Sequence, residues 1–299
     1  MELKHLTCFK RVAELEHLTR AANELYMSQS RLSHVIAELE AELGVKLFDR
    51  EGRGIKLNPC GKAFYRDVVN IMYQIEDSAM RVRELDRRQS IQLTIATNVS
   101  TYMAGLLHAA QEASTGLVIR QYSADRRKIT RMLIDGDIDY ALCCPILTEE
   151  RDLTSSLLYK EKGVVIYPPN HWLKDHKTVS FHEIKNERFI NVGVGYGIRD
   201  VQDAYFSQLG IFPDIVIETT DTSSIFNYVQ EGLGIAIAPR SMTLRHPLFS
   251  KRYAEITEET IATIGLTWRN NHYITESRRV FFDAANIYFS NLKAIVKSL

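Results

Sequence analysis

The 299-residue sequence lacks any run of about 18 apolar residues, the length a helix needs to cross a membrane. Residues 1–5 also lack the apolar core of a signal peptide, so no membrane partner and a cytoplasmic location are expected. The four cysteines, Cys8, Cys60, Cys143 and Cys144, are too few and too scattered for a disulfide framework, and they fit a reducing compartment.

The sequence also has no excess of either charge, because 37 basic residues balance 37 acidic ones. This balance removes the simplest argument for nucleic-acid binding, but it does not exclude a local basic surface. The hydrophobic content of 45% and the charged content of 25% are ordinary for a globular protein. A chain of this length predicts two or more compact units.

Several motifs of enzymes and metal proteins are absent. The glycines at 193, 195 and 197 do not have the G-x-G-x-x-G spacing of a dinucleotide site, and there is no P-loop or G-x-S-x-G elbow. The nine histidines show no zinc-ligand spacing. We therefore expect no cofactor, no metal and no enzymatic activity. Cys143 and Cys144 end a predicted strand, which favours buried thiols over a redox switch.

The chain changes character near residues 87–90. Before this point its apolar residues follow helical spacing, and after it strand and helix patterns alternate. We predict a small, mainly helical domain over residues 1–58, a long helix over 59–88 and an α/β domain over 89–299.

The third predicted helix of the first domain runs from about Ser28, a suitable N-cap, to Leu43, with Gly44 as its C-terminal stop. One face is apolar, whereas the opposite face carries small polar side chains. Two short extended runs around a glycine-containing turn follow and predict a hairpin with Arg53 at its tip.

Helix, short helix, turn, helix and hairpin together form the winged helix-turn-helix arrangement, which presents one helix to the major groove of DNA. Gln29 is suited to a bidentate contact with adenine, and helix N-termini attract phosphate. Taken alone, Ser30 and Ser33 would be ordinary surface serines. The surrounding pattern favours a contact with DNA.

About 60 residues of this region resemble the LysR-type transcriptional regulators. The resemblance lies in residues 18–22, 28–33, 43–50 and 57–61. It implies DNA contacts from Thr19, Arg20, Ser28, Gln29, Ser30, Arg31, Ser33, His34, Arg50 and Arg53. Position 34 is usually arginine in the family and position 31 is usually small, so His34 and Arg31 change the expected base preference. Arg31 can replace the phosphate contact that is lost when position 34 is not arginine.

The long helix begins at Asn58-Pro59, a favourable N-cap and first-turn pair. Apolar residues follow at alternating spacings of four and three, interrupted only by Ser78. A homodimer would cover this row: Phe64, Val68, Ile71, Ile75, Val82 and Leu85. The alternative is that the row packs within its own chain.

The α/β region resembles the family's effector domain, itself similar to periplasmic solute-binding proteins, through residues 133–141 and 230–239. The resemblance implies two subdomains, residues 91–162 with 266–299 and residues 163–265, joined by crossings near 161–165 and 263–267. Ligands bind beyond the carboxyl ends of such strands. The predicted effector residues are Thr97, Asn98, Ser100, Thr101, Tyr196, Arg199, Thr219 and Thr222. These donors favour an anion such as a carboxylate, although Arg199 alternatively pairs with Asp200 or Asp203.

The sequence therefore predicts a regulator that binds double-stranded DNA at an interrupted palindrome and senses a small anionic metabolite. The resemblance implies a homo-oligomer, a dimer of dimers, with RNA polymerase as a further partner. A constitutive DNA-binding protein without an effector, or one governed by a partner protein, is the alternative. An enzyme on the α/β domain is disfavoured because no nucleophile–base pair is present.

Overall fold

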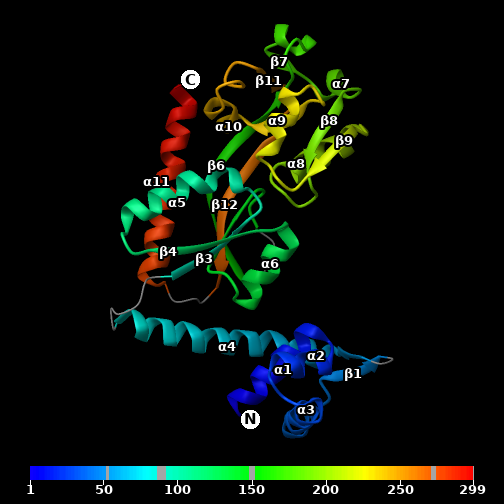
Figure 1. Cartoon of the computed structure of the whole chain (residues 1–299), viewed down its shortest axis with the longest axis vertical. Helices are drawn as coiled ribbons and strands as arrows, with labels where there is room; N and C mark the ends of the chain where they lie inside the picture. The colour runs from blue at the N-terminus through cyan, green and yellow to red at the C-terminus, as the bar shows by residue number, and fades with distance from the viewer. Residues whose placement is uncertain (52–53, 86–91, 148–151, 271–273, 299) are drawn as a thin grey trace. The chain divides into compact units, whose positions relative to one another are not determined.

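The computed structural model describes residues 1–51, 54–85, 92–147, 152–270 and 274–298. The chain forms two compact units, Met1–Arg87 and Arg88–Leu299 (Figure 1). Within the described residues, no helix combines the length and the apolar character needed to span a bilayer.

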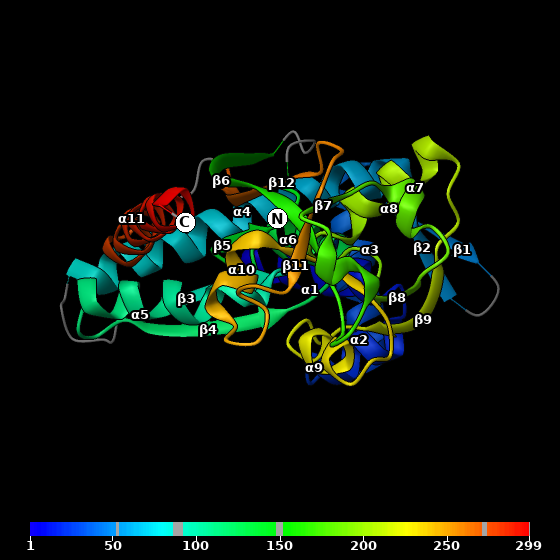
Figure 2. The ribbon, with the colours of Figure 1, turned by 90° about the horizontal axis from the view of Figure 1, so that it is seen from above.

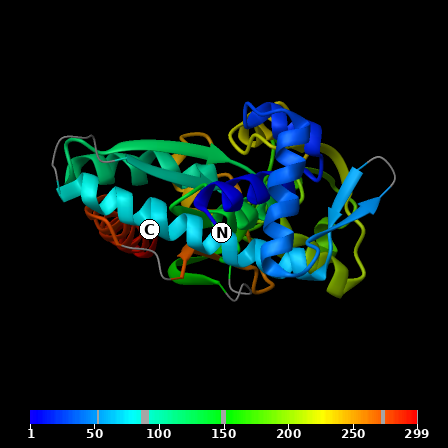
Figure 3. The same cartoon turned by 90° about the horizontal axis from the view of Figure 1, so that it is seen from below.

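The first unit has the expected order of a winged helix-turn-helix domain followed by a long helix. Its elements are α1 (Leu3–Leu15), α2 (Leu18–Glu24), α3 (Gln29–Leu43), β1 (Phe48–Glu51), β2 (Gly54–Leu57) and α4 (Pro59–Leu85). Phe9 is fully buried at the centre of the unit, 5.5 Å from the ring of Phe48 and 5.0 Å from that of Phe64. In Figure 3 the hairpin of β1 and β2, in light blue, projects beyond the darker blue helices.

The predicted helix ends are confirmed by their hydrogen bonds. The Ser28 hydroxyl accepts from the backbone N–H of Arg31 at 3.3 Å, and Gly44 has the positive φ of 72° that ends α3. The Asn58 side chain accepts from the N–H of Gly61 at 2.8 Å, which caps α4 ahead of Pro59.

The residues of the apolar row of α4 differ in burial. Val68 is fully buried and Phe64 packs against the core of the same unit, so the alternative of packing within the chain holds for these two residues. Ile71, Ile75 and Val82 are 38%, 42% and 63% exposed. Dimerisation therefore remains a prediction for these three residues. The side chain of Leu85 lies outside the described residues.

The second unit is built around an eight-stranded sheet in the order β4-β3-β5-β12-β6-β11-β7, with β10 also paired to β6. One half of the second unit, the first lobe, contains the parallel strands β3, β4 and β5, which are covered by helices. Its elements are β3 (Gln92–Thr97), η1 (Ser100–Tyr102), α5 (Met103–Ala113), β4 (Val118–Ser123), α6 (Arg126–Asp135), β5 (Tyr140–Cys143) and α11 (Glu276–Ser298).

The other half, the second lobe, contains the short parallel pair of β8 and β9 and the strands beside the far end of β6. Its elements are η2 (Trp172–Asp175), β7 (Thr178–Val179), α7 (Phe181–Ile184), β8 (Arg188–Val192), α8 (Arg199–Leu209), β9 (Asp214–Thr219), α9 (Ser224–Gln230), β10 (Ala236–Pro239), α10 (Arg240–Arg245) and β11 (Tyr253–Ile256). Seen from above in Figure 2, α8, α9, β8 and β9 are grouped apart from α5, α11, β3 and β4.

Two long antiparallel strands, β6 (Leu153–Ile166) and β12 (Ile261–Arg269), belong to both lobes. β6 pairs with β12 as far as Lys162 and then with β10 and β11. β12 joins β5 from Gly265, where its register with β6 shifts. A side chain at Gly265 would meet Ile146 at 2.1 Å, which explains the glycine.

The last helix, α11, packs along α5 and is anchored by a buried ion pair (Figure 1). Arg278, 2% exposed, donates through Nε to Oδ1 of Asp139 at 2.9 Å. The other oxygen of Asp139 accepts from the N–H of Thr94 at 2.6 Å. The end of the chain is thus fixed to the sheet of the first lobe.

Candidate DNA-binding surface and effector cavity

The outer face of α3 is exposed along its N-terminal half. Leu32, Val35, Ile36 and Leu39 are buried, which leaves the opposite face open. All six predicted DNA-contacting residues of this segment are exposed: Ser28, Gln29, Ser30, Arg31, Ser33 and His34. The short side chains of the three serines allow the backbone of this face to approach base edges closely.

Other predicted DNA-contacting residues flank this helix. Thr19 and Arg20 are exposed at the start of α2, where the N–H of Arg20 donates to Nδ1 of His17 at 3.4 Å. Arg50 is exposed on β1, whereas Arg53 lies outside the described residues. His34 Nδ1 lies 3.2 Å from a carboxylate oxygen of Glu38, one turn further along α3.

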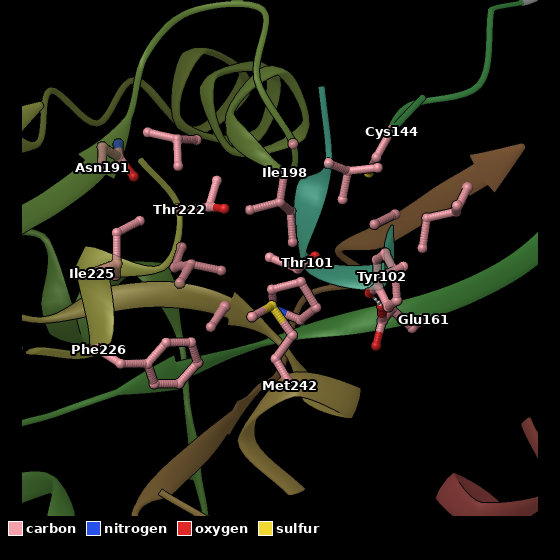
Figure 4. Close-up of a pocket in the computed structure, with 18 residues that line it drawn as sticks. Thr101, Tyr102, Cys144, Glu161, Asn191, Ile198, Thr222, Ile225, Phe226 and Met242 are labelled. Atoms are coloured by element: carbon pink, nitrogen blue, oxygen red, sulfur yellow. Dashed lines mark hydrogen bonds between the residues drawn. The ribbon is translucent and has the colours of Figure 1, made fainter. Parts of the chain in front are cut away.

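The second unit contains a cavity between its lobes, with about 570 Å³ of space, part of it open to solvent. It lies beyond the carboxyl ends of β3 and β5 in the first lobe and of β8 and β10 in the second, the usual ligand position in α/β folds. Figure 4 shows its walls converging from both lobes.

The lobes are tied together next to this cavity. Asn98 donates to the carbonyls of Cys144 and Gly195, at 2.9 Å each, and its backbone carbonyl accepts from Gly197 at 3.0 Å. The hydroxyls of Ser100 and Thr222 lie 3.1 Å apart, one from each lobe. Opening the cavity would break the bonds that join Asn98 to Gly195 and Gly197, and the contact between Ser100 and Thr222.

The structure places two of the eight predicted effector residues, Thr101 and Thr222, in the lining of the cavity. Asn98 and Ser100 hold its rim through the bonds just described. Thr97 is buried behind it, where its hydroxyl donates to Leu142 at 2.8 Å. The remaining three residues lie outside the lining: Tyr196, Arg199 and Thr219.

Arg199, which was predicted to hold an anion, has its guanidinium engaged with groups of its own chain. Its guanidinium donates to both oxygens of Asp203 at 2.8 Å, to Glu218 at 2.9 Å and to the carbonyl of Val192 at 2.8 Å. The alternative pairing with Asp203 is therefore right, although Arg199 is buried rather than on the surface. Its donors are used in holding α8 against the β8–β9 pair.

Sequence analysis missed the polar residues that define the cavity wall. Glu161 on β6 and Asn191 on β8 line it and are 6% and 2% exposed. Glu161 accepts from the Tyr102 hydroxyl and, at 3.0 Å, from the N–H of Ser241. Burial, followed by the neighbouring Glu161, raises the pKa of Tyr102 well above its usual range. The sequence signal for Asn191 is a polar residue within the otherwise apolar run at 189–194.

The vicinal cysteines are core thiols, as predicted. Both are buried, and Cys144 contributes to the cavity wall. Burial raises the pKa of Cys143 to about 12 and raises that of Cys144 as well. Across the described part of the chain, no three His, Cys, Asp or Glu side chains are grouped to hold a metal ion.

Comparison with known proteins covers both units. Residues 3–62 match the family described as bacterial regulatory helix-turn-helix protein, lysR family, and residues 86–288 match the LysR substrate binding domain. The transcriptional dual regulator GltC of Bacillus subtilis is 31% identical over 98% of this chain and 99% of its own length. The Hca operon transcriptional activator HcaR of Escherichia coli is 29% identical over 81% of this chain and 83% of its own.

Solved structures share the fold at lower identity. Full-length OxyR from Pseudomonas aeruginosa superposes with a TM-score of 0.67 at 19% identity, covering 97% of this chain and 94% of OxyR. CbnR in complex with its target DNA has a TM-score of 0.54 at 22% identity, covering 97% of this chain and 100% of CbnR. With both domain matches and a relative of 31% identity along its whole length, the chain belongs to the LysR family of transcriptional regulators.

Proposed function

We propose that this regulator binds an interrupted palindromic DNA site. We propose further that its mode of binding to that site changes when a small carboxylate enters the cavity between its lobes. The observation that carries the proposal is the cavity itself, lined from both lobes and bordered by hydrogen bonds that cross between them. The domains we propose follow the sequence analysis: DNA binding over 1–58, a linker helix over 59–88 and effector binding over 89–299.

The proposed DNA interface is the exposed face of α3, with Gln29 reading a base edge. Arg20, Arg31 and Arg50 are exposed around it and supply positive charge for phosphates. A palindrome requires two such helices, and the exposed residues Ile71, Ile75 and Val82 of α4 offer an apolar row for pairing two chains. A dimer of dimers and contact with RNA polymerase extend this proposal.

The proposed effector is a carboxylate because uncharged donors gather where helices begin. Thr101 lies in η1, ahead of α5, and Thr222 lies just before α9. Helix starts and hydroxyls favour anions. The effector binding domain of QuiR, which shares this fold at 20% identity, was solved in complex with shikimate, a small carboxylate.

The proposed response follows from linkage. A ligand that bridges the two lobes stabilises their closed arrangement and shifts the population toward it. In an oligomer this shift alters the spacing of the DNA-binding units and hence the half-sites held and the bend imposed on the DNA.

The test is fluorescence anisotropy with a duplex selected from a random library, titrated with and without a panel of metabolites. We expect nanomolar binding to the selected duplex and at least one carboxylate that alters the affinity or the DNA bend. DNA binding that no compound alters would support the alternative of a constitutive regulator. Failure to select any duplex would refute the DNA proposal.

A further inference from the structure

The wall of the effector cavity has an unusual balance of groups for a site that binds an anion. Among the described residues that line it, Glu161 carries a formal charge, and none is Lys, Arg or His. Most of the others are apolar, among them Ile225, Phe226 and Met242. The wall therefore suits a ligand with a substantial apolar body.

The acidic end of the cavity is built from three segments. Glu161 comes from the strand shared by the lobes, Tyr102 from η1 in the first lobe and Ser241 from α10 in the second. One carboxylate oxygen accepts from the Tyr102 hydroxyl (Figure 4). The other accepts from the Ser241 N–H at 3.0 Å. Both carboxylate oxygens of Glu161 therefore already accept a hydrogen bond within the protein. A second negative charge brought beside it would be repelled strongly in this poorly solvated position.

The other polar group of the wall is Asn191, which Figure 4 shows well apart from Glu161. Its side chain is buried, and its Nδ2 has no hydrogen-bond partner among the described residues. The buried hydroxyl of Thr101 likewise has none. Unmet buried donors are costly, so a ligand that accepts hydrogen bonds gains affinity at this point.

We infer that the cavity selects monocarboxylates with an apolar body and rejects dicarboxylates, with Asn191 holding the single carboxylate and Glu161 excluding a second one. This inference rests on the proposed function, because it assigns the chemical class of the effector. The charge of Glu161 repels a second carboxylate. The apolar side chains between the two ends of the cavity contact the body of the ligand.

Matched probes test the inference by calorimetry on the full-length protein. Hexanoate and adipate share a six-carbon chain and differ by one terminal carboxylate, as benzoate and terephthalate share a ring. We expect the wild type to bind each monocarboxylate at least tenfold more tightly than its dicarboxylate. In Glu161→Gln we expect the preference to fall by tenfold or more, mainly through tighter dicarboxylate binding. Asn191→Ala should weaken both monocarboxylates at least tenfold.

A matched control variant keeps the outcomes separate. Glu112→Gln removes an exposed acid of α5 and should leave the preference unchanged. If Glu161→Gln does not fold, the ratio of hexanoate to adipate affinity in the wild type still tests the inference. A wild type that prefers adipate, or an unchanged preference in folded Glu161→Gln, would overturn the inference.

If none of the four probes binds but another class of metabolite does, the inference fails and effector sensing stands. If no compound of any class binds while the protein still binds DNA, both the inference and the proposal of effector sensing are refuted.

Discussion

The side-chain amide of Asn98 donates to the carbonyl of Gly195 at 2.9 Å, although the two residues lie 97 positions apart in the sequence. Asn98 directly follows β3 of one lobe, and Gly195 lies in the loop after β8 in the other. The same side chain accepts from the N–H of Cys144 at 2.9 Å. One buried residue thus joins both lobes and the ends of β3 and β5 at the rim of the effector cavity.

Replacing Asn98 with alanine should destabilise the closed arrangement. The substitution leaves three buried backbone groups without their partner, and each buried hydrogen bond contributes about 1 kcal/mol. We expect a loss of about 2–3 kcal/mol in the free energy of unfolding of the second unit, measured by urea denaturation. Asn186→Ala, at an exposed turn, is the matched control. Equal stability of the two variants would contradict the role assigned to Asn98.

Arg199→Ala should affect stability and leave effector binding intact. Asp203 and Glu218, its partners, are 42% and 51% exposed, so the loss should be about 2 kcal/mol, smaller than for a fully buried pair. Thermal unfolding and calorimetry of the folded variant separate the two effects, with exposed Arg188→Ala as control. A large loss of effector affinity at unchanged stability would restore the anion-binding role.

Local signals made the first unit predictable from sequence. Ser28 and Gly44 act within one turn of α3, and Asn58 and Pro59 act within the first turn of α4, so the helix bounds follow from adjacent residues. The apolar row of α4 was harder to interpret. Its period shows a buried face, but only the packing distinguishes Val68, which faces its own core, from Val82, which is exposed.

The cavity was less predictable because its wall is assembled from distant segments. Strand β11, for example, is four residues long, and its partners β6 and β7 are remote in sequence. The pairing of Arg199 with Asp203 was visible at a spacing of four residues, whereas Glu218, 19 residues away, was not. The exposure of Glu161 to the cavity depends on contacts from both lobes.

Ile75→Glu should weaken self-association if the exposed row of α4 pairs two chains. A charge at the centre of an apolar helix contact removes buried area and adds a desolvation cost. We expect a lower molar mass at micromolar concentration, measured by light scattering after size exclusion. The adjacent Gln74→Glu adds the same charge outside the row and should keep the wild-type mass. An unchanged mass in Ile75→Glu would point to another interface.

The cysteines should differ sharply in their reaction with iodoacetamide. Cys60 is exposed, whereas Cys8, Cys143 and Cys144 are buried and burial raises the pKa of each. A raised pKa means less thiolate at a given pH, so at pH 8 we expect mass spectrometry to find alkylation at Cys60 alone. Cys60→Ser should then remain unlabelled until the protein unfolds. Rapid labelling of Cys143 or Cys144 in the folded protein would instead support a redox role.

Gln29→Ala tests whether α3 reads bases. The side chain is exposed at the first residue of the helix, and a bidentate contact to adenine contributes about 1–3 kcal/mol of discrimination. We expect the affinity for the selected duplex to fall roughly tenfold or more, since about 1.4 kcal/mol corresponds to tenfold, while the affinity for a scrambled duplex changes little. Gln208→Ala, exposed on α8 of the second unit, should change neither. Equal losses on both duplexes would assign Gln29 to the DNA backbone, because phosphate contacts weaken binding regardless of sequence.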